Sequence, residues 1–123
     1  MDSKTVIKVI GIGGAGGNAV NRLANMGVSG AQLVAVNTDK QHLAMISDEL
    51  TKVLIGKSVT RGLGAGGFPA KGREAAKETI SELKKAVSNA DMVFVLAGLG
   101  GGTGSGGVPV VAQLAKEAGA VVI

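Results

Sequence analysis

Residues 92–107 read MVFVLAGLGGGTGSGG, an apolar run of six residues followed by a segment in which seven of ten residues are glycine. The apolar run is typical of a strand buried on both faces of a parallel sheet. In the segment 98–107, which we call the carboxyl-terminal glycine segment, backbone N–H groups can form an anion-binding nest. Thr103 and Ser105 add hydroxyl donors. The stretch therefore predicts a phosphate-binding loop at the carboxyl end of a buried strand.

A similar arrangement occurs near the start of the chain, where residues 6–20 read VIKVIGIGGAGGNAV. Gly11, Gly13 and Gly16 form G-x-G-x-x-G between a predicted strand and a predicted helix at about 18–26, and we call residues 11–17 the amino-terminal glycine segment. Such a turn brings N–H groups and a helix N-terminus to a phosphate. Alone, the motif favours a dinucleotide-dependent oxidoreductase, which needs an acid at the end of the second strand. That strand ends in Asn37, with Asp39 two residues beyond.

Short apolar runs alternate with helical patterns along the rest of the chain. Strands are predicted at 6–12, 32–37, 52–55, 92–97 and 120–123. Helices are predicted at 18–26, after a Thr38-Asp39 cap, as one long helix from Pro69 to Val87, and from Pro109 to Gly119. This alternation predicts an α/β fold, a Rossmann-like three-layer parallel sheet with right-handed crossovers.

Three further features of the sequence are a glycine-rich loop, a partial match to a Walker A motif and a single histidine. Residues 61–69 read RGLGAGGFP and are expected to form a loop, of which 62–67 is the middle glycine segment. Gly56-Lys57-Ser58 comes closest to a Walker A loop, but no helical pattern follows it. His42, the single histidine, is expected to have a surface role.

Composition narrows the function. With 123 residues we expect one domain and no second module. The absence of cysteine excludes disulfides and thiolate metal sites and favours the reducing cytoplasm. The net charge is +4, but Phe68 and Phe94 are the only aromatic residues, too few to stack on nucleic acid. The longest apolar run is far below the roughly 20 residues of a membrane-spanning helix. Because the last predicted strand has barely begun at residue 123, we expect a truncated domain.

The motifs together resemble the tubulin/FtsZ family, in its FtsZ branch of cell-division GTPases. GGGTGSG at 100–106 resembles the family signature, and other stretches are similar in the same order. These are IGIGGAGGNAVNRL at 10–23, VAVNTDKQHL at 34–43, TRGLGAGG at 60–67 and PVVAQLAKEAGA at 109–120. The resemblance covers essentially the whole chain. It implies the N-terminal part of a GTP-binding domain over residues 1–123, with strand order 3-2-1-4-5 truncated after the start of the fifth strand.

The resemblance also implies the site residues. The first nucleotide loop is formed by Gly14, Ala15, Gly16, Gly17 and Asn18. The terminal phosphate is sensed by Ala65, Gly66 and Gly67. The phosphates are gripped by Gly98, Gly101, Gly102, Thr103, Gly104 and Ser105. Asn37 and Asp39 are expected near the sugar and base. A side chain at Gly102 is expected to fill the space of a phosphate or to require a backbone with φ > 0.

For the whole protein, the resemblance implies GTP or GDP as ligand, with Mg²⁺ held through the nucleotide phosphates and no protein metal ligands. It implies a cytoplasmic GTPase that self-associates head to tail in filaments, without binding nucleic acid or inserting in a membrane. The family's catalytic acidic loop comes from the next subunit, so no catalytic residue is expected within residues 1–123.

The sequence departs from the family pattern at three places. Ser105 stands where the FtsZ branch usually has threonine, Gly107-Val108 replaces Ala-Ala, and Phe68 and Ala70 replace an asparagine and a glutamate. Three functions therefore stay open: a polymerising GTPase, a dinucleotide-binding oxidoreductase domain, and a folded fragment without activity.

Overall fold

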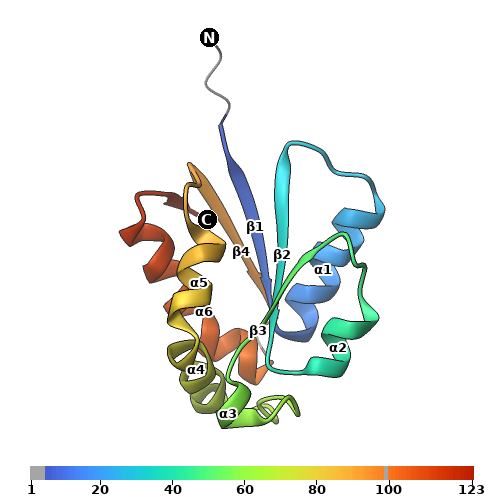
Figure 1. Ribbon diagram of the computed structural model, residues 1–123, viewed down its shortest axis with the longest axis vertical. Helices are drawn as coiled ribbons and strands as arrows, with labels where there is room; N and C mark the ends of the chain where they lie inside the picture. The colour runs from blue at the N-terminus through green and yellow to red at the C-terminus, as the bar shows by residue number, and fades with distance from the viewer. Residues whose placement is uncertain (1–4, 99) are drawn as a thin grey trace.

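Five parallel strands form the centre of the molecule, in the order β3-β2-β1-β4-β5 (Figure 1). The computed structural model describes residues 5–98 and 100–123. The strands are β1 (Ile7–Ile12), β2 (Ala31–Asn37), β3 (Thr51–Leu54), β4 (Met92–Ala97) and β5 (Val121–Val122). The helices are α1 (Gly13–Asn25), α2 (Lys40–Met45), α3 (Lys57–Thr60), α4 (Pro69–Glu78), α5 (Ile80–Val87) and α6 (Gly102–Glu117). The predicted fold class and strand order are confirmed.

Helices cover both faces of this sheet, with α1 and α2 on one side and α4, α5 and α6 on the other (Figure 1). Successive residues of β1 point to opposite faces. Val9 packs in a cluster with Val20 of α1, whereas Ile10 packs in a larger cluster with Leu83 of α5 and Val111 of α6. The chain leaves β1 toward one side of the sheet and β4 toward the other. The topological switch point, where open α/β sheets bind ligands, therefore lies between β1 and β4.

The structure corrects the predicted starts of two helices. α1 begins at Gly13 instead of near residue 18, and α6 begins at Gly102 instead of at Pro109. Most residues of the amino-terminal and carboxyl-terminal glycine segments therefore form the first turns of helices instead of loops. Glycine costs a helix about 1 kcal/mol relative to alanine, but tertiary packing requires it here. A Cβ at Gly16 would collide with the Leu96 carbonyl oxygen.

Pro109 lies inside α6, although its ring leaves no N–H for the helix. The residue is exposed, and the helix continues to Glu117. Gly119, with φ of +91°, follows the end of the helix as predicted.

The long helix predicted from Pro69 to Val87 is broken at Thr79, which has φ −114° and ψ 29°. The Thr79 hydroxyl donates to the carbonyl of Ala75 at 2.9 Å and accepts from the backbone N–H of Gly56 at 2.9 Å. Hydroxyl bonding to the i−4 carbonyl competes with the helix ladder. The break therefore attaches the helices to the segment after β3. Ile80, the residue after the break, is 36% exposed.

Two smaller predictions are also wrong. The one-turn helix α3 follows Gly56, which has φ of +67°, where no helix was expected. In β4 only Val93 is fully buried: Phe94 and Leu96 are partly exposed on the α1 side of the sheet, and Val95 is partly exposed on the other side. Of the helices in the described ranges, none has the length and apolar character needed to cross a membrane.

Candidate functional site

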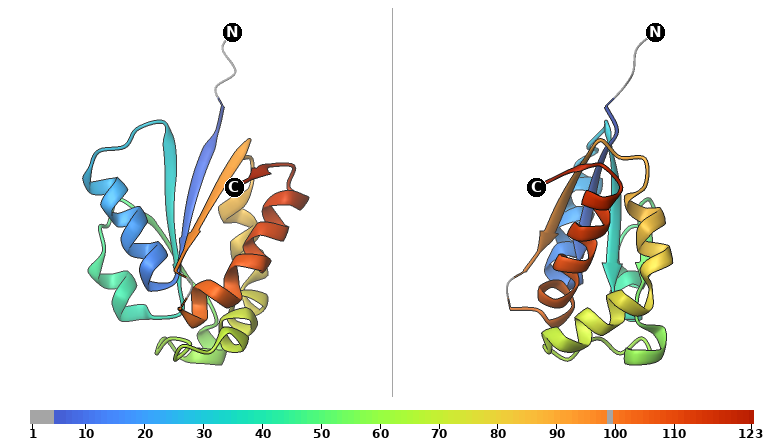
Figure 2. Two further views of the ribbon diagram at one scale, coloured as in Figure 1. Left: turned by 180° about the vertical axis from the view of Figure 1, so that it is seen from behind. Right: turned by 90° about the vertical axis from the view of Figure 1, so that its left-hand side faces the viewer.

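The two glycine segments meet at the switch point. Ile12 and Ala97 are paired in the sheet, so β1 and β4 end level with each other. α1 starts directly after β1, and α6 starts four residues after Gly98. A Cβ at Gly13 would lie 3.1 Å from the backbone nitrogen of Gly104. The first turns of the two helices are therefore in contact, as Figure 2 shows at the carboxyl ends of the strands.

The middle glycine segment lies against the first turn of α6. A Cβ at Gly102 would lie 2.6 Å from the backbone nitrogen of Phe68 and 2.9 Å from the carbonyl carbon of Gly67. Phe68 N donates to the Ala65 carbonyl at 3.1 Å, which closes a turn. The carboxyl-terminal glycine segment therefore contacts both of the other segments at the carboxyl ends of the strands.

Exposure divides the predicted site residues. The buried ones are Gly16, Gly17, Ala65, Gly102, Thr103 and Gly104. Two are half-buried, Gly98 and Ser105. The exposed ones are Gly14, Ala15, Asn18, Gly66, Gly67 and Gly101.

Two of these glycines, Gly14 and Gly101, are explained neither by packing nor by a positive φ. A Cβ at Gly98 would lie 2.8 Å from the Cβ of Ala15, and one at Gly16 would collide with backbone. Nothing lies within 4 Å of a Cβ added at Gly14 or Gly101, and neither residue has a positive φ. The buried glycines therefore allow close approach of protein segments, whereas Gly14 and Gly101 leave open space beside the two helix starts.

Thr103 does not present its hydroxyl to this open space. Its Oγ1 lies 2.6 Å from Oγ1 of Thr38, and both residues are buried. Thr60 Oγ1 donates to the Thr38 carbonyl at 3.3 Å. The hydroxyl pair ties the end of β2 to the first turn of α6. The sequence predicted Thr38 only as part of a helix cap, and its place directly after β2 was the one signal for this contact.

His42 joins the end of β2 to α1. Its Nε2 lies 3.0 Å from Oδ1 of Asn18, and its Nδ1 lies 3.4 Å from Nδ2 of Asn37. Asp39 accepts a hydrogen bond from the His42 backbone N–H at 3.1 Å and caps α2, as predicted. His42 is half-buried between Asn18 and Asn37, so its ring is less exposed than a residue with a surface role is expected to be.

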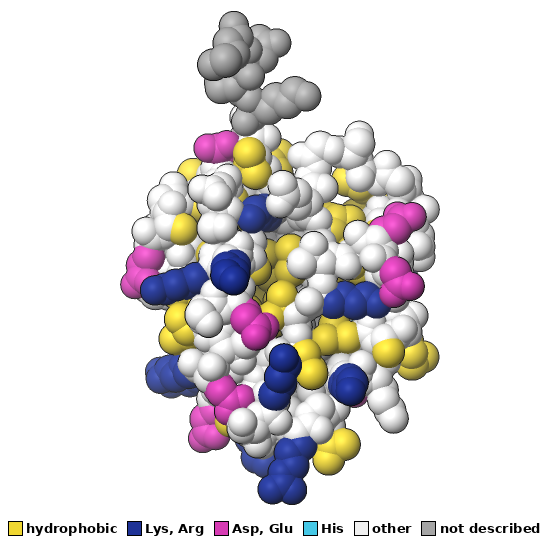
Figure 3. All heavy atoms as spheres, in the orientation of Figure 1, with side chains coloured by type: hydrophobic (Ala, Val, Ile, Leu, Met, Phe, Trp, Pro, Cys, Tyr) yellow, Lys and Arg dark blue, Asp and Glu magenta, His cyan; other side chains and the backbone are white. Residues whose placement is uncertain are grey.

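Basic side chains lie on the surface next to the middle glycine segment. Lys40, Lys57 and Arg61 line a groove beside the middle glycine segment, together with Lys52 and Glu82. Figure 3 shows Lys and Arg side chains scattered over the viewed face, with Asp and Glu side chains among them. A local excess of cations raises the concentration of anions near a site. Over residues 5–98 and 100–123, no group of three or more His, Asp or Glu side chains is placed to hold a metal ion.

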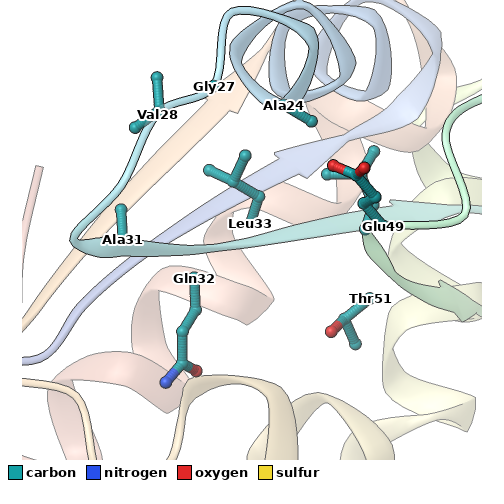
Figure 4. Close-up of a pocket in the computed structure, with 9 residues that line it drawn as sticks. Ala24, Gly27, Val28, Ala31, Gln32, Leu33, Glu49 and Thr51 are labelled. Atoms are coloured by element: carbon teal, nitrogen blue, oxygen red, sulfur yellow. The ribbon is translucent and has the colours of Figure 1, made fainter.

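A separate pocket lies at the other end of α1, where the helix meets the starts of β2 and β3 (Figure 4). Its lining includes Ala24, Val28, Leu33 and Thr51, with Glu49 as the charged side chain. Among the described residues, its lining includes no Lys or Arg side chain and no helix N-terminus, so the pocket lacks the positive groups of an anion site.

These features define a Rossmann-like α/β protein in which two glycine-rich helix starts meet at the switch point of a parallel sheet. Comparison with known families matches residues 6–123 to the Tubulin/FtsZ family, GTPase domain. The chain belongs to the Tubulin/FtsZ family. This membership confirms the predicted family and favours it over the oxidoreductase alternative.

Individual relatives agree with this assignment. Cell division protein FtsZ 2 of Haloferax volcanii is 56% identical over 117 residues, which are 95% of this chain and 29% of that protein. The structure of an empty FtsZ dimer of M. jannaschii superposes with a TM-score of 0.92 at 53% identity, covering 96% of this chain and 34% of that one. The GTPγS-bound protofilament of CetZ2 from Haloferax volcanii gives 0.69 at 36% identity, covering 89% and 35%. The chain thus spans about a third of the length of these relatives.

Proposed function

We propose that this chain supplies the phosphate-binding part of a GTP site in an FtsZ-type GTPase. The observation that carries the proposal is the open space at Gly14 and Gly101, beside two helix starts that contact each other. The first N–H groups of a helix have no acceptor within the helix, and the helix dipole adds positive potential there. Two such ends at one place suit the charge of a di- or triphosphate.

The residues present fit such a ligand. In α6 the amide of Ser105 donates to the carbonyl of Gly101 at 3.1 Å, so the amides at 102–104 precede the helix ladder. We assign phosphate binding to residues 14–18, to Gly98 and to residues 101–105, with 65–67 beside the terminal phosphate. A bound GTP would supply the phosphoryl group for transfer to water, and Mg²⁺ would be held through the nucleotide phosphates. The chain's own residues bind and orient the nucleotide.

The activity of the whole protein forms part of the same proposal. One relative is named a cell division protein, and two related structures are described as an FtsZ dimer and a CetZ2 protofilament. We infer that the protein is a cytoplasmic cell-division GTPase that assembles head to tail with copies of itself, a contact that generates filaments. Residues 1–123 then form the N-terminal part of its GTP-binding domain, without nucleic-acid or membrane partners.

Calorimetric titration of GDP into the 123-residue chain tests the phosphate site. Gly101→Ala fills open space without a clash inside the protein, so its cost should fall on the ligand. We expect GDP to bind the wild type and the variant to bind about tenfold more weakly, the equivalent of one lost hydrogen bond. Ser81→Ala, on the exposed face of α5, is the matched control and should leave the affinity unchanged. No GDP binding, or equal affinity in Gly101→Ala and wild type, would overturn the site.

A further inference from the structure

Asn37 has a side-chain amide of fixed orientation. Its Oδ1 accepts hydrogen bonds from the backbone N–H of Thr38 at 2.8 Å and of Asp39 at 3.1 Å. Because backbone N–H groups only donate, the atom that faces them must be the oxygen. Nδ2 therefore faces His42. Asn37 is 4% exposed, so its amide hydrogens need acceptors within the protein.

The state of the His42 ring follows from this orientation. Nδ1 lies 3.4 Å from Nδ2 of Asn37 and must accept, because an amide nitrogen is only a donor. A neutral ring with an unprotonated Nδ1 carries its proton on Nε2. Nε2 lies 3.0 Å from Oδ1 of Asn18 and donates to it.

Asn18 receives its orientation in turn. Its Oδ1 is engaged by the ring, so its Nδ2 lies on the other side of the amide. Asn18 is exposed, and its Nδ2 contacts no acceptor among residues 5–98 and 100–123. It lies one residue beyond the amino-terminal glycine segment, so two N–H donors are available at the edge of the proposed phosphate site.

The glycine segment itself accommodates the ring. A Cβ at Gly17 would lie 3.1 Å from Cε1 and 3.6 Å from Nδ1 of His42. Cε1 lies between the two ring nitrogens, so a side chain at position 17 would displace both from their partners. Gly17 thus serves the position of His42 as well as the close packing of α1.

We propose that His42 is a positioning residue that turns the Asn18 amide so that its N–H group donates to an acceptor atom of the bound guanine nucleotide. This inference rests on the proposed function. His42 acts through Asn18. The backbone N–H groups of residues 38 and 39 fix the Asn37 amide, the amide fixes the His42 ring, and the ring orients the Asn18 side chain on α1.

Two substitutions at position 42 separate the two ring nitrogens. A glutamine nitrogen reaches the place of Nε2 and can donate to Asn18, but it leaves Asn37 Nδ2 without its partner. An asparagine oxygen reaches the place of Nδ1 and can accept from Asn37, but it leaves Asn18 free to rotate. We expect His42→Asn to lower GDP affinity about threefold to tenfold with near wild-type melting temperature. We expect His42→Gln to keep the affinity and to melt at a lower temperature.

A double-mutant cycle completes the calorimetry. Asn18→Ala should lose GDP affinity to the same extent as His42→Asn, and combining them should add nothing, because both remove the same donor. Independent, additive losses would mean that His42 acts by another route and would overturn the inference.

The ring can also be observed directly, without nucleotide. His42 is the only histidine in the chain, so long-range ¹H–¹⁵N spectra report a single ring. In the neutral ring we expect the proton on Nε2. A proton on Nδ1, or equal GDP affinity in His42→Asn and His42→Gln, would overturn this inference and leave the phosphate site intact. A wild-type chain that fails to bind GDP would overturn the proposed function and this inference with it.

Discussion

Glycines in the two helix starts serve two distinct purposes at the scale of single residues. Gly16 and Gly102 are buried, and a Cβ at either would meet backbone atoms of another segment. Gly14 and Gly101 are exposed beside open space. Side chains are therefore excluded from the first pair by the fold, and from the second pair, in our proposal, by the ligand.

Gly14→Ala should make the free protein more stable and the complex weaker. Gly14 lies in the first turn of α1 with a φ that alanine accepts, so the substitution should raise the free energy of unfolding by about 0.5 kcal/mol. GDP affinity should fall, because the added methyl group occupies the space of the phosphate. Urea denaturation and calorimetry measure the two effects.

Gly16→Ala is the matched control for this prediction. The same methyl group would collide there with the Leu96 carbonyl oxygen, and the stability should fall. A Gly14→Ala protein that is less stable than wild type, or that binds GDP equally well, would contradict the assignment.

The surroundings of Gly102 change the effect that is expected of a side chain at this position. A side chain at Gly102 was expected to fill the space of a phosphate or to force out a φ > 0 backbone. Gly102 has no positive φ, and the backbone of Phe68 already occupies that space. Gly102→Ser should therefore displace the middle glycine segment as well as weaken nucleotide binding, so it does not isolate the ligand.

Thr38→Val should destabilise the fold. The change removes one of two buried hydroxyls that lie 2.6 Å apart and leaves Thr103 Oγ1 without this partner. An unsatisfied buried hydroxyl costs about 1–3 kcal/mol, measurable by urea denaturation. The double variant Thr38→Val/Thr103→Val should recover part of the loss, because replacing both partners with apolar groups is nearly neutral. A double variant less stable than the single one would refute this account.

At the scale of elements, a buried lysine connects β1 to the end of α5. Lys8 is 8% exposed, and its Nζ donates to the carbonyls of Ala86 at 3.0 Å and Ser88 at 2.7 Å. Carbonyls at a helix C-terminus lack donor partners within the helix and carry the negative end of its dipole. The ammonium therefore satisfies both groups and secures α5 against the sheet.

Lys8→Met should keep the packing of the aliphatic stem and remove these hydrogen bonds. We expect a loss of about 2 kcal/mol in the free energy of unfolding and faster amide exchange in the last turn of α5. Lys84→Met, at an exposed position of the same helix, provides the comparison and should change stability little. Equal stability of the two variants would show that the Lys8 ammonium contributes nothing.

At the scale of the whole molecule, the segments of the proposed phosphate site carry no acidic side chain. The segments 13–18, 65–67 and 98–105 contain no Asp or Glu. Asp39, which follows β2, accepts the His42 backbone N–H as the cap of α2. Phosphoryl transfer to water requires a residue that positions the water molecule.

The 123-residue chain by itself should therefore release phosphate from GTP no faster than buffer, at any protein concentration. A phosphate-release assay on the purified chain measures this, with GDP binding as proof that the site is formed. Turnover that disappears in Gly101→Ala would show that the catalytic group lies within these residues and that the expectation of an incoming acidic loop is wrong.

The sequence by itself determined the α/β class, the five strands, the position of both glycine segments and, through family resemblance, the strand order. These features follow from local periodicity and from glycine clusters that interrupt it, which are visible without knowledge of distant contacts. The cap at Asp39 and the helix end at Gly119 were also predictable, because capping depends on a few neighbouring residues.

Only the tertiary structure decided where α1 and α6 begin, that the helix breaks at Thr79, and that His42 joins Asn18 to Asn37. It also separated glycines needed for packing from those beside open space. Each of these depends on how closely segments far apart in the chain approach one another. Residue propensities describe a residue among its neighbours in sequence, so they contain no information on the carbonyl, hydroxyl or ring that another segment places against it.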